Sequence, residues 1–125
     1  MLAVGYSPLQ PFVEALFARD FLALEHSLAP GVAFRALYPR GVGEATSAAE
    51  ARAFLDDWFG DAEHFEIVST TFDSVGNRAH ASYRVHIVQR GVAKECQQHL
   101  FADVGSRGIE KLDLLCSGFV TRRSG

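Results

Sequence analysis

The chain has few cysteines and no excess of basic residues, and both shortages exclude classes of function. Its two cysteines lie far apart in sequence, and no CxxC or HExxH motif occurs. Protein metal sites need a denser cluster of ligands, so we expect no metal. The net charge is −3, whereas nucleic-acid binding relies on concentrated positive charge. We therefore expect no nucleic-acid partner, and the absence of a GxGxxG or P-loop motif predicts no nucleotide cofactor.

Long apolar runs are missing as well. No segment approaches the roughly 20 apolar residues that cross a bilayer, so we expect no membrane partner. Residues 1–6 lack the basic start and long apolar centre of a secretory signal. The sequence therefore predicts a cytoplasmic protein, in which Cys96 and Cys116 are free thiols rather than a disulfide.

What is present is the composition of a soluble globular domain. Of the 125 residues, 48% are hydrophobic and 22% charged, and ten are phenylalanine. A chain of this length supports one hydrophobic core. We expect a single domain over residues 1–125, with its core at about 8–119 and a short flexible tail at 120–125.

The first half of the chain predicts helices. Phe12, Leu16 and Phe17 recur at helical spacing, and Asp20 is placed to cap a second short helix that residues 29–31 end. Thr46 or Ser47 is a good N-cap for a third helix at 48–60, and Glu50 is in the position of a capping box when Ser47 caps.

The second half predicts strands. A short strand at 32–38 and a flexible loop at 39–43 precede the third helix. Period-two patterns then follow at 65–73 and 79–90, and a hairpin over 95–119 turns at residues 105–108. Helices first and a meander of strands last predict an α+β fold. We expect a cone-shaped, strongly curved, mostly antiparallel sheet wrapped around the amphipathic third helix.

The closing hairpin sets the two faces of this sheet. If Val104 faces Ile109, then Cys96 lies opposite Cys116 and His99 lies opposite Asp113, with the two couples on opposite faces. Similar pairing across Gly91 places Tyr83 opposite Leu100, Val85 opposite Gln98 and Ile87 opposite Cys96. Burial of apolar side chains favours one face as the inner one: Tyr83, Val85, Ile87, Cys96, Gln98, Leu100, Ala102, Leu112, Leu114 and Cys116. The outer face then holds His80, Ser82, Arg84, His86, Gln97, His99, Phe101, Asp103, Lys111 and Asp113.

The element order, the bend at Asp20, the loop at 39–43 and the ending GIEKLDLLCSGF resemble the nuclear-transport-factor-2-like superfamily. More narrowly, the chain looks like the SnoaL-like polyketide cyclases and ketosteroid isomerases. The resemblance implies a small apolar molecule inside the cone and a homodimer through the sheet. The isomerases' phenol and carboxylates would fall near Phe12, near Ala36 or Leu37, and near Leu100, all apolar here. We therefore do not expect steroid isomerase chemistry, which needs such groups.

Candidate site residues follow from the faces. Gln98 and Tyr83 are unusual polar groups on the inner face, and we name them as candidate catalytic or ligand-orienting residues; the alternative is that they satisfy each other or the backbone. His99 and Asp113 form a candidate acid–base pair only if they face inward, and otherwise belong to a polar ladder. The expected ligand-lining residues are Phe12, Phe34, Tyr38, Phe54, Trp58, Leu100, Leu114 and Cys116.

Three functions are compatible with this pattern. The first is an isomerase- or cyclase-like enzyme, without cofactor, that acts on a small hydrophobic carbonyl compound. The second is a non-catalytic module whose cone binds an apolar ligand or is filled by aromatic side chains. The third is an interaction protein whose outer sheet face pairs with another copy, with His80, His86 and His99 making the contact sensitive to pH.

Overall fold

A mixed α+β fold is seen in the computed structural model, which describes residues 7–122. In this range the chain order is α1 (Gln10–Ala18), α2 (Phe21–His26), β1 (Leu28–Tyr38), β2 (Gly41–Ala45), α3 (Ala48–Phe59), β3 (His64–Val75), β4 (Arg78–Gln89), β5 (Val92–Gly105), β6 (Gly108–Cys116) and β7 (Val120–Thr121). No helix in this range is long and apolar enough to cross a membrane.

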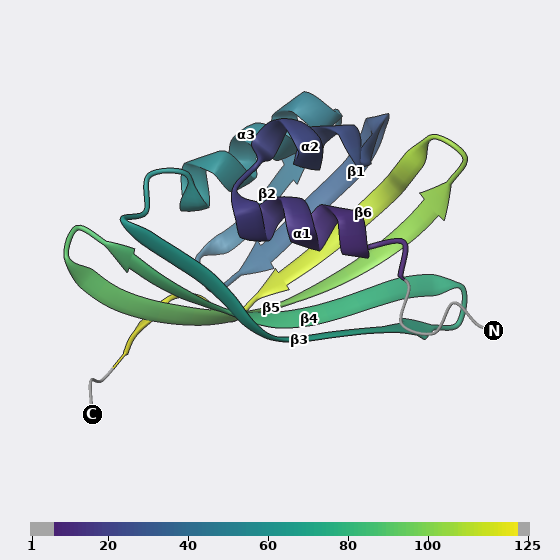
Figure 1. The fold of residues 1–125 in the computed structure, drawn as a ribbon. Helices are drawn as coiled ribbons and strands as arrows, with labels where there is room; N and C mark the ends of the chain where they lie inside the picture. The colour runs from purple at the N-terminus through teal and green to yellow at the C-terminus, as the bar shows by residue number, and fades with distance from the viewer. Residues whose placement is uncertain (1–6, 123–125) are drawn as a thin grey trace.

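One curved sheet carries the whole domain. Its strand order is β2-β1-β6-β5-β4-β3, and the short β7 pairs with β5. The pairing of β1 with β6 is parallel, and the other pairings are antiparallel. All three helices lie on one side of the sheet (Figure 1). The predicted fold class, a curved and mostly antiparallel sheet with helices inside, is confirmed.

The helices begin where the sequence predicts. The Asp20 carboxylate accepts a hydrogen bond from the Ala23 amide at 3.1 Å and so caps α2. Ser47 Oγ accepts from the Glu50 amide at 3.1 Å at the start of α3. Glu50 Oε1 accepts in turn from the Thr46 amide at 3.0 Å, one residue earlier than in an ordinary capping box. These caps use the amide groups that a helix leaves without partners in its first turn.

Three segments differ from the prediction. Strand β1 begins at Leu28, so it includes residues that we expected to end a helix. The expected flexible loop at 39–43 is largely β2, which pairs with β1 across a tight turn. Within the expected tail, residues 120 and 121 form β7 beside Lys94 and Glu95. Neighbouring backbone hydrogen-bond partners override weak local strand signals in all three cases.

The predicted register is wrong in two places. Val104 does face Ile109, but a bulge follows, so His99 faces Leu115 and Phe101 faces Asp113. The chain between β4 and β5 turns at Arg90 and Gly91, so Tyr83 faces Gln98. The predicted His99–Asp113 and Cys96–Cys116 cross-strand pairs are therefore not formed. A bulge adds a residue to one strand only, and its position is not visible in the period-two pattern.

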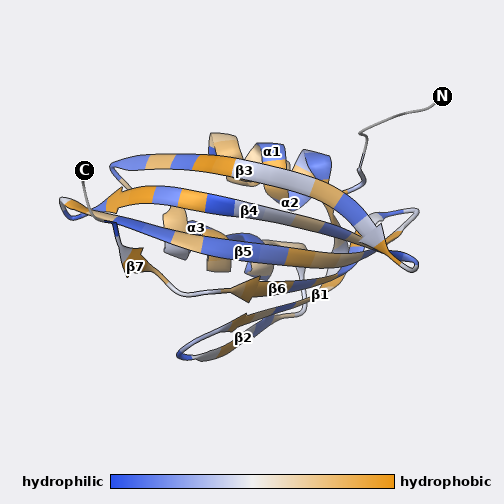
Figure 2. Cartoon of the chain, turned by 90° about the horizontal axis from the view of Figure 1, so that it is seen from below, coloured by the Kyte–Doolittle hydropathy of each residue, from blue (hydrophilic) through white to orange (hydrophobic). Residues whose placement is uncertain are grey.

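The two faces are nevertheless those that the sequence predicts. All ten residues assigned to the inner face are buried. They pack against Phe12, Leu16, Leu55 and Phe59 from the helices in a single core. The register error of two residues between β4 and β5 leaves side-chain parity unchanged. Figure 2 shows the opposite, outer side of the sheet, where hydrophilic and hydrophobic residues alternate along the strands.

Candidate functional site

A chain of hydrogen bonds links three neighbouring strands on the inner face. Tyr83 Oη on β4 donates to Gln98 Oε1 on β5 at 2.7 Å. Gln98 Nε2 then donates to Cys116 Sγ on β6 at 3.4 Å. All three residues are buried, and direct cross-strand pairing of Tyr83 with Gln98 and of Gln98 with Cys116 brings them together. Burial raises the pKa of Tyr83, so its phenol keeps the proton that it donates.

Cys116 is the polar end of this chain, and its sulfur receives further donors. The Gly118 amide donates to Cys116 Sγ at 3.4 Å, because the chain turns sharply after β6. Cys96 is also free and buried, two residues along β5 from the residue opposite Cys116. The Cys96 thiol, ahead of the hydrogen bonds from Gln98 and Gly118, lowers the pKa of Cys116 to about 6. The same interaction with Cys116 raises the pKa of Cys96, which keeps its proton.

A pocket of about 500 Å³ lies where the ends of β1, α3 and β6 meet the start of β5, and it reaches Cys116; we call it the mouth pocket. Tyr38 and Trp58 line it, with ring centroids 5.4 Å apart in an edge-to-face arrangement. Phe119 completes an aromatic wall, 6.4 Å from Trp58. The remaining lining residues are Pro39, Arg40, Lys94, Ser117, Gly118 and Val120. Flat apolar walls with a few polar groups are typical of small-molecule sites.

The predicted ligand-lining residues divide into three groups. Tyr38, Trp58 and Cys116 line the mouth pocket. Phe54 stands behind them, with its ring 4.8 Å from that of Trp58. The others lie in the buried core: Phe12, Phe34, Leu100 and Leu114. Tyr83 and Gln98 are also outside the pocket wall and reach it through Cys116.

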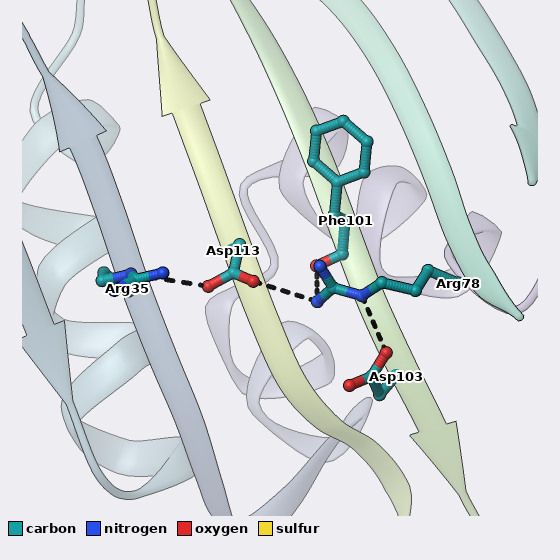
Figure 3. Close-up of polar contacts among 5 residues, drawn as sticks. All are labelled: Arg35, Arg78, Phe101, Asp103 and Asp113. Atoms are coloured by element: carbon teal, nitrogen blue, oxygen red, sulfur yellow. Dashed lines mark hydrogen bonds and ion pairs between the residues drawn. The ribbon is translucent and has the colours of Figure 1, made fainter. Parts of the chain in front are cut away.

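Asp113 lies on the outer face, between two arginines. Its carboxylate is 3.7 Å from Arg35 Nε and 2.9 Å from Arg78 Nη2. Arg78 Nε also binds the Asp103 carboxylate at 2.8 Å, and its Nη2 donates to the Phe101 carbonyl. Figure 3 shows this row, with residues from β1, β6, β5 and β4. Asp113 therefore belongs to a ladder of ion pairs on the outside of the cone.

His99 lies on the same outer face but in a separate cluster. Its Nδ1 is 3.1 Å from His80 Nε2, and His80 Nδ1 is 2.6 Å from the Asp73 carboxylate. The two imidazoles stack with centroids 5.3 Å apart. The inward orientation on which an acid–base role for His99 and Asp113 depends is not found. His26, which the sequence left undecided, is exposed on α2.

Sequence reasoning missed the hydrogen-bond donors around Cys116 and part of the pocket wall. The Gly118 amide, Phe119 and Lys94 gather around Cys116 only because the chain reverses after β6 and β7 returns to β5. Gly118 has a φ of +90°, a conformation that favours glycine. A glycine two residues after a cysteine was the sequence signal available for this turn. In residues 7–122 no group of three or more His, Cys, Asp or Glu side chains is placed to hold a metal ion.

Comparison with known proteins adds information about the fold. No family model matches the sequence, and no curated protein matches it. Among solved structures, a candidate polyketide cyclase from Xanthomonas campestris pv. campestris is 21% identical, with a TM-score of 0.70 over 86% of each chain. A second candidate polyketide cyclase, from Pseudomonas putida KT2440, is 16% identical, with a TM-score of 0.69 over 86% of each chain.

A third structure extends the comparison to another activity. An LEH-like epoxide hydrolase from M. tuberculosis is 13% identical, with a TM-score of 0.69 over 88% of this chain and 80% of the hydrolase. At these identities the similarity is one of fold, and one fold hosts many chemistries. The chain has the nuclear-transport-factor-2-like, SnoaL-like fold that its sequence resembles.

Proposed function

We propose that the protein binds a small hydrophobic carbonyl-type molecule in the mouth pocket. The observation that carries this proposal is the half-buried aromatic wall of Tyr38, Trp58 and Phe119. This wall lies beside Cys116, the end of the buried hydrogen-bond chain that reaches the pocket. The rings provide apolar contact area at little conformational cost. Lys94 and Arg40 line the same pocket and supply hydrogen-bond donors suited to a carbonyl oxygen.

Binding and conversion are separate parts of the proposal. The polar groups nearest the pocket on the inner face are Gln98 and Tyr83, and they remain our candidates for an isomerase- or cyclase-like reaction. Both are buried and already joined to each other, which suits a role in orienting Cys116 more than direct contact with a ligand. An enzymatic role would be supported if the wild type converts a ketone and a Gln98→Leu variant does not.

Trp58 allows binding to be measured directly, because it is the single tryptophan of the chain. We expect aromatic ketones such as 2-acetonaphthone to change its fluorescence saturably. A Tyr38→Ala variant, which loses one pocket wall, is expected to bind at least about five-fold more weakly, equivalent to roughly 1 kcal/mol. A Leu22→Ala variant on the exposed surface of α2 serves as the control and is expected to bind normally.

The binding proposal fails if no member of a panel of ketones changes the fluorescence of Trp58 or the melting temperature. It also fails if the Tyr38 and Leu22 variants bind equally well, since the ligand would then lie elsewhere.

A second candidate function is pairing of two copies through the outer sheet face. Leu37, Val42 and Leu115 are exposed there on β1, β2 and β6. They line a groove of about 590 Å³ together with Phe101. Arg35, Glu44 and Asp113 border the same groove, so both signs of charge occur on one surface. An isologous dimer brings a patch against its own copy, which requires this kind of mixed charge.

A further inference from the structure

The sulfur of Cys116 lies where two N–H donors converge. Gln98 Nε2 and the Gly118 amide are each 3.4 Å from it, and the neighbouring Cys96 thiol also lowers its pKa. A neutral thiol is a weak acceptor that carries its own proton. Two N–H donors aimed at one sulfur therefore favour the thiolate, which is the nucleophilic form of cysteine.

The orientation of the Gln98 amide is itself determined by a neighbour. Because the Tyr83 phenol donates to Gln98 Oε1 at 2.7 Å, the amide presents its NH₂ group to Cys116. Tyr83 and Gln98 are fully buried, so water does not compete for this bond. The buried chain thus behaves as a relay of donors that ends on one sulfur at the wall of the mouth pocket.

The charged and titratable groups around the sulfur favour the same state. Cys96 on β5 and Tyr83 on β4 are the titratable groups on its buried side, and both keep their protons because their pKa values are raised. On the pocket side the titratable groups are Tyr38, Arg40 and Lys94, of which two are cations. The lowered pKa of Cys116 agrees with this arrangement.

We propose that Cys116 is a nucleophilic site that forms a covalent adduct with small α,β-unsaturated carbonyl compounds entering the mouth pocket. This proposal rests on the proposed function in one respect: a small molecule must enter the same pocket. A thiolate is a soft nucleophile that prefers the soft β-carbon of an enone, and the aromatic wall accepts a flat apolar molecule of that class.

The addition needs no further reactant. A sulfur lone pair forms the carbon–sulfur bond at the β-carbon, and the electron pair of the double bond moves through the carbonyl carbon to leave an enolate oxygen. The α-carbon then takes one proton from water. The product is a thioether whose mass equals that of the protein plus the enone, because no group leaves.

The test uses 2-cyclohexenone with the reduced wild-type protein. Trypsin cleaves after Lys94, Arg107, Lys111 and Arg122, so Cys96 and Cys116 fall on separate peptides, 95–107 and 112–122. We expect one adduct per chain, on peptide 112–122. Its rate is expected to rise with pH to a half-maximum near 6. At pH 7 most of Cys116 is then the thiolate, and the rate is close to its plateau. The thiolate fraction is about 30-fold larger than that of an ordinary thiol at the same pH.

Two substitutions at Cys96 separate donation from packing. Cys96→Ser keeps a hydroxyl donor beside Cys116, and Cys96→Ala removes it with little change in size. We expect the half-maximum to stay within about half a pH unit in the first variant and to rise by at least one unit in the second. A purely structural role for Cys96 would leave both profiles alike, and this result would contradict the donor arrangement.

The outcomes distinguish this proposal from simple ligand binding. Saturated cyclohexanone, which has no electrophilic β-carbon, is the matched ligand. If ketones bind but the enone forms no adduct, the nucleophilic site is disproved and the binding function stands. If the adduct forms although no saturated ketone binds, the nucleophilic site stands without that function. Labelling of Cys96 at an equal rate, or a half-maximum above 8, overturns the proposal, because both describe an ordinary thiol exposed by unfolding.

Discussion

Cys116 and Gln98 show how single residues acquire properties that their types do not predict. A buried free cysteine is usually a small apolar side chain, and a buried glutamine is usually satisfied by any nearby partner. Here each is placed by cross-strand pairing so that the amide of one donates to the sulfur of the other. The sequence predicts which residues share the inner face, but not this direction of donation.

The thiol pair gives stability a specific pH dependence. Between about pH 6 and the ordinary cysteine range near 8.5, Cys116 has lost its proton in the folded chain but keeps it when unfolded. The unfolded state then binds more protons, so the free energy of unfolding rises with pH, by at most about 1.4 kcal/mol per pH unit. Above that range Cys96 ionises only when unfolded, because its pKa is raised in the fold, and stability falls again.

Urea unfolding under reducing conditions, repeated from pH 5.5 to 9.5, measures the pH at which the free energy of unfolding is highest. A Cys116→Ala variant is the reference, because it removes this thiol and keeps every other titratable side chain. The difference curve is expected to rise and then level off or fall. A flat difference between pH 6 and 8.5 would show that Cys116 has an ordinary pKa in the folded chain.

At the scale of elements, local signals and long-range pairing contribute unequally. The start of α3 is readable because Ser47 and Glu50 act within one turn. The register of β5 with β6 is not readable, because one extra residue near Glu110 shifts every later pair. The observed pairs differ from the predicted ones by two residues in both hairpins, so parity and hence burial were predicted correctly, whereas the His99–Asp113 pair was not. Strand β2 carries too little pattern of its own to be recognised without β1.

The N-cap of α3 is expected to contribute measurably to stability. A Ser47→Ala variant loses the acceptor for the Glu50 amide and should unfold with a free energy lower by about 1 kcal/mol. Ser47→Asp keeps an acceptor at the same position and should stay near the wild type. Urea unfolding of the two variants at pH 7 makes the comparison, and equal losses in both would show that Ser47 acts through something other than its cap.

At the scale of the whole molecule, the sheet separates two surfaces with different chemistry. The concave side carries the helices, the core and the mouth pocket, and the convex side carries the ion-pair row and the apolar groove (Figures 1 and 3). The sequence predicts this division because alternation along four long strands is hard to mistake. It predicts three residues of the pocket wall, Tyr38, Trp58 and Cys116, but not the whole wall, which needs residues from β1, α3, β5 and the chain end together.

Pairing of copies through the outer face has a direct test in sedimentation velocity. We expect a dimer for the wild type and dissociation for Leu115→Lys, since Leu115 is 45% exposed in the groove. Leu22→Lys is the matched control, because Leu22 is 63% exposed on α2, on the helical side of the sheet. A monomeric wild type at every concentration, or equal dissociation of both variants, would rule out this interface.

The short pairing of β7 with β5 determines how a molecule reaches the sulfur. Strand β7 pairs with β5 at Lys94–Thr121 and Glu95–Val120, and the Arg122 and Ser117 amides donate to Ala93 and Gln97 on either side. In contrast, β5 is paired along most of its length with β4. A two-residue ladder opens locally far more often than the central sheet does. We therefore expect the segment between Cys116 and Thr121 to open more often than the rest of the pocket wall. Its amide hydrogens should exchange with deuterated solvent well before those of β5, and ligand association should be no faster than this opening.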